Sequence, residues 1–200
     1  MTWLVLGLVL FLGAHSVRIV AEGWRTAMVA RLGVQGWKGA YSLLSAAGLA
    51  LIVIGYGAAR QEPVPLWSPP VWTRHVAALL NLAALVMVVA AYVPRNHVQR
   101  ALKHPMILGV KVWAFAHLIA NQTLADLVLF GAFLAWAVLD YRAARRRDPA
   151  GAAGVAGAAA VRRPPTLAGT AVTVLVGAAA WAFIAFWAHG AWIGVRPFGV

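Results

Sequence analysis

Residues 2–21 read TWLVLGLVLFLGAHSVRIVA, an almost continuous apolar run whose second half carries His15 and Arg18. A helix needs about 20 predominantly apolar residues to cross the hydrocarbon core of a bilayer, and this run is long enough. Five further stretches of the same kind follow it along the chain. The sequence therefore predicts six transmembrane helices, which are Thr2–Ala21, Lys38–Ala58, Arg74–Tyr92, Pro105–Ala120, Leu124–Asp140 and Thr166–His189.

The composition supports an all-α, polytopic transmembrane bundle. Hydrophobic residues make up 62% of the 200 residues and charged residues 11%, against about 45–50% and 25% in soluble domains. Six spans use about 120 residues, which excludes a sizeable soluble domain. The absence of cysteine excludes thiolate-ligated haem, iron–sulfur clusters and disulfides. In a membrane chain, the net charge of +12 indicates cytoplasmic loops and anionic lipid, not nucleic acid.

The connections between the predicted spans suggest how the chain is organised. Only residues 121–123 join the fourth and fifth spans, so we expect a tight helical hairpin there. Residues 148–165 are rich in Gly and Ala and predict a flexible linker that isolates the last span. We therefore predict a five-span core over residues 1–141, a basic cytoplasmic linker over 142–165, and a sixth helix with a short outer tail over 166–200.

Positive charge predicts the orientation of these spans. The connections after the first, third and fifth spans, with their flanks, hold 13 Lys and Arg residues. The opposite side holds three, and Lys111 lies inside a span. Because basic residues concentrate on the cytoplasmic side, both termini are predicted on the non-cytoplasmic side.

Histidine is the residue type on which any chemistry must rest. The sequence shows no paired carboxylates, no Gly-rich phosphate loop and no serine hydrolase constellation. His15 lies in the cytoplasmic half of its span, and His104 precedes Pro105 at the predicted start of a helix, on the same side. Two imidazoles at one depth on different helices can bind one haem iron through its axial positions. The structural alternative is that His104 caps its helix while His15 bonds to a neighbouring carbonyl.

A second group of histidines is predicted near the outer face. His117 follows His104 by 13 residues, about 20 Å along one helix, so these two cannot share a metal. His75 and His189 lie at the predicted level of His117, where the three suggest a second haem or a divalent metal site. His75 and His117 form the alternative ligand pair, and His97, in a basic loop, is predicted to be solvated.

Three basic residues lie close in predicted depth to His15 and His104. Arg18, Lys103 or Lys111 is therefore predicted to neutralise a propionate of a bound haem, because a buried propionate without a cation is costly. For Arg18 and Lys111, an ion pair with a nearby carboxylate is the structural alternative. Arg18 lies four residues before Glu22 on one helix face, and Lys111 has Asp126 and Asp140 on the neighbouring helix.

Four motifs carry a family resemblance. They are LGAHSVR (residues 12–18), RLGVQGWKGAYSL (31–43), WTRH (72–75) and KHPMILGVKVWAFAHL (103–118). In this order they resemble the NnrU family of bacterial membrane proteins. The resemblance covers nearly all of residues 7–141 and, more loosely, the last span.

The resemblance implies a function and a location. The NnrU family is linked by name to nitrite and nitric oxide reduction in denitrification, and it is related to 15-cis-zeta-carotene isomerase, a membrane enzyme with histidine-ligated haem b. The His-Ser and His-Pro motifs of that relative match His15-Ser16 and His104-Pro105. We therefore expect a multi-pass protein of the bacterial inner membrane that binds haem b through His15 and His104.

Three functions remain open on this basis. The first is a haem protein supporting nitrogen-oxide respiration, with nitric oxide or reductase machinery as its partner. The second is a haem-dependent cis-trans isomerase of a carotenoid or another lipophilic polyene. The third is a cofactor-free transport or assembly factor, whose intramembrane polar groups line a path.

Overall fold

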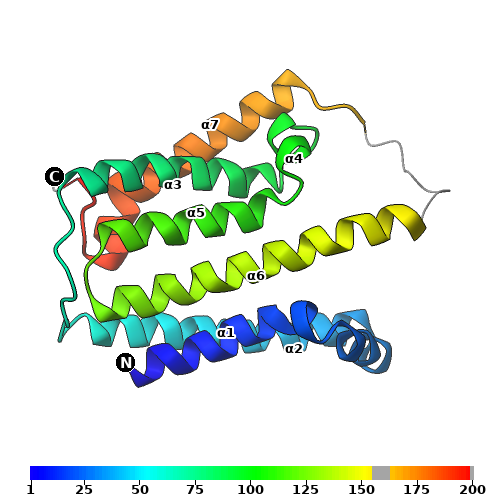
Figure 1. Cartoon of the computed structure of the whole chain (residues 1–200), viewed down its shortest axis with the longest axis horizontal. Coiled ribbons are helices and arrows are strands. Elements are labelled where there is room, and N and C mark those ends of the chain that lie inside the picture. Colours follow the sequence, from blue (N-terminus) through cyan, green and yellow to red (C-terminus); the bar gives the residue numbers. More distant parts are fainter. Residues whose placement is uncertain (155–162, 199–200) are drawn as a thin grey trace. The chain divides into compact units, whose positions relative to one another are not determined.

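The protein is all-helical in the computed structural model, which describes residues 1–154 and 163–198. Over these ranges no strand occurs, and a single antiparallel bridge joins Pro65 to Thr123. The α-helices, coloured along the chain in Figure 1, are α1 (Thr2–Val20), α2 (Glu22–Ala59), α3 (Trp72–Ala90), α4 (His97–Leu102), α5 (Pro105–Ala120), α6 (Leu124–Gly154) and α7 (Leu167–Phe183). A π-helix, Ile184–Ile193, continues α7. The predicted fold class is confirmed.

Five of these helices are long and apolar enough to cross a membrane, which identifies a membrane protein. They are α1, α2, α3, α6 and α7 with its π-helical extension. The predicted fourth span corresponds to α5, which has the predicted bounds but only 16 residues. At 1.5 Å per residue α5 is about 24 Å long, somewhat less than the thickness of a hydrocarbon core.

The helices fall into two compact units that differ from the predicted domains. One unit holds residues 1–68 and 122–140, and the other holds residues 69–121 and 141–200. The last helix therefore belongs to the second unit. This differs from the prediction that a linker isolates it. Glycines let α7 pack directly on the other helices of the second unit. A Cβ at Gly177 would lie 2.7 Å from Val86 Cα in α3, and a Cβ at Gly169 would lie 2.7 Å from Arg95 O.

The predicted linker region over 142–165 is helical in its first part. Helix α6 continues to Gly154, so the segment from 142 to 154 is helical. The run RAARRR over residues 142–147 explains this extension, because Ala and Arg rank among the strongest helix formers. Residues 155–162 of the predicted linker lie outside the described part of the chain.

In the first unit, α1 and α2 approach so closely that glycine is required at three contacts. A Cβ at Gly55 would lie 2.2 Å from Leu4 N, one at Gly7 would lie 2.6 Å from Ile52 N, and one at Gly48 would lie 2.7 Å from Phe11 N. Small residues of this kind let helix backbones touch in membranes. The pairing runs antiparallel and leads from Leu4 along α1 toward His15.

Larger side chains hold α6 against this pair of helices. Phe133 of α6 lies 5.9 Å from the ring of Phe11. At the start of α6, Thr123 donates from its backbone N (2.9 Å) and its hydroxyl (2.7 Å) to Asp126 Oδ2, and Tyr56 Oη donates to Asp126 Oδ1 at 2.5 Å. This bonding satisfies a buried carboxylate and ties the end of α2 to the start of α6.

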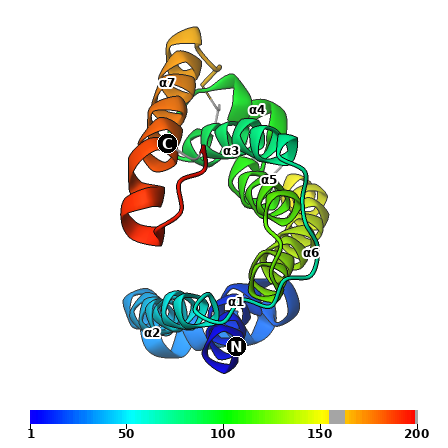
Figure 2. The ribbon, with the colours of Figure 1, turned by 90° about the vertical axis from the view of Figure 1, so that its left-hand side faces the viewer.

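In the second unit, α3 lies between α5 and α7, as Figure 2 also shows. A Cβ at Gly109 of α5 would lie 2.8 Å from Ala84 O of α3. The short helix α4 is capped by Asn96, whose Oδ1 accepts from Gln99 N at 2.6 Å. This cap positions the turn from which His104 and α5 follow.

Candidate functional site around His15

His15 lies in the first unit, where three helices supply its neighbours. Its ring stacks on Phe11 of α1 with the centroids 4.2 Å apart. Tyr41 of α2 lies 5.2 Å away, and Trp136 of α6 meets it edge-on at 6.0 Å. The imidazole is partly buried among these rings, so its orientation is fixed by packing.

One hydrogen bond sets the chemistry of the His15 ring. His15 Nδ1 lies 2.7 Å from the carbonyl oxygen of Phe11. A carbonyl only accepts, so Nδ1 carries the proton, and in the neutral ring the lone pair is on Nε2. No described residue bonds to that Nε2. Metal-binding histidines commonly have this arrangement, in which a bond from one nitrogen orients the other.

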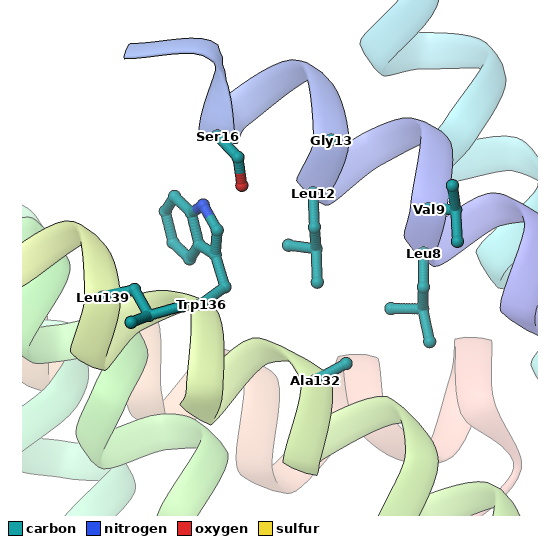
Figure 3. Close-up of a pocket in the computed structure, with 8 residues that line it drawn as sticks. All are labelled: Leu8, Val9, Leu12, Gly13, Ser16, Ala132, Trp136 and Leu139. Atoms are coloured by element: carbon teal, nitrogen blue, oxygen red, sulfur yellow. The ribbon is translucent and has the colours of Figure 1, made fainter. Parts of the chain in front are cut away.

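An apolar groove of about 380 Å³ lies between α1 and α6, and Trp136 of its lining also contacts the His15 ring. Figure 3 shows its lining, which comprises Leu8, Val9, Leu12, Gly13, Ser16, Ala132, Trp136 and Leu139. A Cβ at Gly13 would meet nothing within 4 Å. Gly13 thus leaves space in the groove, whereas Gly7, Gly48 and Gly55 make close helix contacts.

Trp136 belongs both to the groove and to the surroundings of His15. Its indole Nε1 is buried and has no hydrogen-bond partner within the described residues. Leaving a buried donor unpaired costs about 1–3 kcal/mol. A bound molecule with an acceptor atom would remove that cost.

His104 lies in the second unit, at the N-cap position of α5 before Pro105, as predicted. Its side chain makes no capping bond, which contradicts that half of the structural alternative. The other half, a bond from His15 to a neighbouring carbonyl, is confirmed. His104 Nε2 instead lies 3.0 Å from Asp148 Oδ1, and Arg145 Nη1 lies 3.1 Å from the other oxygen of that carboxylate. Since a carboxylate accepts, Nε2 carries a proton, and in the neutral ring only Nδ1 has a lone pair. The joint binding of one iron by His15 and His104 stays a prediction.

The three predicted propionate partners lie in different surroundings. Arg18 Nε is 3.7 Å from Glu22 Oε2, the alternative that its spacing offered. The Lys111 ammonium lies 5.7 Å from the centre of the Tyr141 ring, over its face. Lys103 ends α4 with a φ of 60° and adds to the positive charge around Asp148.

The remaining histidines do not form the metal site predicted at the outer face. No group of three His, Cys, Asp or Glu residues suited to a metal ion occurs among the described residues. His117 donates to Trp113 O (2.9 Å) and His189 to Val195 O (2.6 Å), while His75 is exposed. His97, predicted to be solvated, is exposed but also bonds to Thr170 Oγ1 at 2.8 Å.

Two parts of the site were missed by sequence reasoning. They are Trp136, which lies inside a predicted span, and Asp148, which lies in the predicted linker. A helical period continued beyond Asp140 would have kept Asp148 in α6. Nothing local in the sequence marks Trp136, because its significance depends on an unsatisfied nitrogen.

The comparison with known protein families agrees with this picture of a helical membrane protein. The model of the family described as NnrU protein matches residues 3–197, which include all the spans and the His15 and His104 motifs. No curated protein and no solved structure matches the chain. The match extends over nearly the whole sequence, and the chain belongs to the NnrU protein family.

Proposed function

We propose that this protein binds haem b in the membrane with His15 as an axial ligand, and that it acts in nitrite or nitric oxide reduction. The observation that supports haem binding is the His15 ring itself. Its Nδ1–H is held by Phe11 O at 2.7 Å and its Nε2 retains a lone pair among aromatic side chains. The link to nitrogen oxides is what the NnrU resemblance implies for a member of that family.

The residues present offer the kinds of atoms that bind haem, a metal-ligating nitrogen and a hydrogen-bond donor. His15 offers an oriented, neutral imidazole, and the buried Trp136 Nε1 offers a hydrogen bond that no described residue accepts. Haem b, when bound, supplies one-electron chemistry and a site for diatomic gases. The protein supplies orientation and a water-poor surrounding.

His104 is the proposed second ligand, because its His-Pro motif matches that of the haem-binding relative. In the neutral ring it binds through Nδ1, or it gives up the Asp148 bond to present Nε2. Arg18, Lys103 and Lys111 are the proposed propionate partners. Replacing all three by Gln should lower haem occupancy, whereas unchanged occupancy and unfolding would contradict their role.

An absorption spectrum of the full-length protein purified in detergent tests the haem proposal. We expect a Soret band and sharp α and β bands after reduction, which indicate six-coordinate haem b. A colourless preparation from cells supplied with a haem precursor would contradict the proposal and favour a cofactor-free transport or assembly role.

The apolar groove favours a second candidate function, haem-dependent isomerisation of a carotenoid or another lipophilic polyene. The groove is lined mainly by apolar residues and has a volume of about 380 Å³, within the range of small-molecule sites. Gly13→Leu should fill it without a backbone clash, because nothing lies within 4 Å of the added Cβ.

Gly131→Leu is the matched control for that variant. Gly131 is also a helical glycine with open space around it, but it does not line the groove. If the groove binds a polyene, Gly13→Leu should abolish polyene isomerisation while Gly131→Leu retains it. Equal isomerisation by both variants would remove the groove from this role.

We further propose the bacterial inner membrane as the location, with both termini on its non-cytoplasmic side. The support is the bias of 13 basic residues to three. A reporter fused to the C-terminal end that works only in the cytoplasm should be silent, and a strong signal would reverse the orientation.

A further inference from the structure

The first part of α2 is a separate short helix between two breaks. Ala21, with φ −140° and ψ 44°, separates it from α1, and Gly33, with φ 71° and ψ 164°, separates it from the rest of α2. Residues 22–32 form this first arm, and residues 34–59 form the second arm. The first arm is about 16 Å long, which is too short to cross a bilayer. Figure 1 shows that the two arms are not collinear.

A pair of tryptophans fixes how the first arm lies. Trp24 and Trp37 meet edge-on with their centroids 5.9 Å apart. They lie nine residues before and four residues after Gly33, so they would be far apart if the arms continued in one line. The first arm therefore bends back toward the second. Trp37, at the start of a spanning segment, belongs at the membrane–water interface, and its contact places Trp24 at that level.

The first arm presents apolar and cationic side chains outward at this level. Trp24 is 54% exposed and Leu32 is 53% exposed. Arg31 and Lys38 are also exposed, and neither has an ion pair among the described residues. Residues 18–38 hold four cations and one acid, Glu22, which pairs with Arg18 and Arg25. By sequence the segment therefore carries an excess of positive charge.

We propose that residues 22–32 form an interfacial helix that lies in the plane of the membrane and binds anionic lipid headgroups. Tryptophan and leucine on such a helix insert at the boundary between headgroups and acyl chains, while Arg and Lys bind the phosphates. The surface that Arg25, Arg31 and Lys38 present is complementary in charge to an anionic bilayer. This proposal does not depend on haem binding.

Site-specific labels test the placement of the helix. The chain has no cysteine, so single Cys variants can be spin-labelled and reconstituted in bilayers of phosphatidylglycerol and phosphatidylcholine. Leu32→Cys should be accessible to oxygen and protected from a water-soluble nickel reagent. Thr26→Cys on the opposite face should be more accessible to nickel, like the exposed loop control Glu62→Cys. A Leu32→Cys label as accessible to nickel as the Glu62→Cys label would overturn the proposal.

Charge variants test the lipid preference. The triple variant Arg25→Gln, Arg31→Gln, Lys38→Gln should reduce selectivity for spin-labelled phosphatidylglycerol over phosphatidylcholine, by about fivefold for each cation that contacts the surface. The matched control replaces Arg74, Arg100 and Arg142 and should retain most of the selectivity. Equal selectivity in the two triple variants would refute a specific role for this helix. The Cys labels on an otherwise unchanged chain give an answer even if a triple variant fails to fold.

Discussion

The two histidines of the predicted site differ in which ring nitrogen is held. At His15 a backbone carbonyl of the same helix holds Nδ1, so the outer nitrogen, Nε2, has the lone pair. At His104 a carboxylate from α6 holds Nε2. The first arrangement orients a ligand atom away from the helix. The second occupies that atom and leaves Nδ1, which lies closer to the backbone.

This difference predicts unequal roles for the two residues. His15 is held by packing on Phe11, Tyr41 and Trp136 and needs no rearrangement to offer Nε2. His104 must either bind through Nδ1 or exchange Asp148 for the metal. We therefore expect His15 to anchor the haem and His104 to be the ligand that is more easily displaced.

The largest effect is expected from removing the anchoring ligand. His15→Ala should lose most of the Soret absorbance per protein, because no other described side chain replaces its oriented Nε2. His104→Ala should retain haem in a five-coordinate form that binds carbon monoxide quickly. The ratio of Soret absorbance to protein absorbance in the purified variants measures how much haem each retains. Equal haem loss in the two variants would contradict the assigned asymmetry. If both variants keep the spectrum of the unchanged protein, His75 and His117 are the next ligand pair to replace.

The next effect concerns the close α1–α2 packing that positions His15. Gly55→Ala should destabilise the protein by about 1–3 kcal/mol, because the added Cβ lies 2.2 Å from Leu4 N and the backbones must separate. Gly57→Ala, on the same helix in open space, should be neutral or slightly stabilising. Denaturation in detergent followed by helical circular dichroism gives both values. Equal stability of the two variants would show that the helices relax freely.

A smaller effect is expected where α6 joins the first unit. Tyr56→Phe removes one of the donors to the buried Asp126 carboxylate, leaving the two from Thr123. A hydrogen bond to a charged group contributes about 1.5–3 kcal/mol, and we expect a loss near the lower end. The same denaturation measurement applies, with Tyr92→Phe as an exposed control. A stability equal to that control would mean that water replaces the phenol.

The smallest effect on stability is expected at the partner of His104. Asp148→Ala should leave thermal unfolding nearly unchanged, since the carboxylate is partly exposed. It should release His104 Nε2, strengthen the second axial bond and slow the binding of carbon monoxide to the reduced protein. Stopped-flow absorbance measures this rate. A faster rate than in the unchanged protein would mean that Asp148 supports His104 as a ligand.

The sequence alone determined the fold class and the positions of the two candidate histidines along their helices. Apolar runs of bilayer length require helices, because backbone groups in lipid must bond within their own segment. For the same reason the bounds of α5 agree with the predicted fourth span. The pairing of Arg18 with Glu22 also followed from helical spacing, which is a local property.

Only the tertiary structure decided how those helices associate and which atoms of the site are engaged. The grouping of α7 with α3 depends on the contact at Gly177, and apolar spans of similar composition carry little information about their neighbours. The bond between His104 and Asp148 joins residues 44 positions apart. The unsatisfied Trp136 nitrogen is likewise defined by what surrounds it. Local periodicity fixes helices, whereas contacts between distant residues fix the chemical state of a side chain.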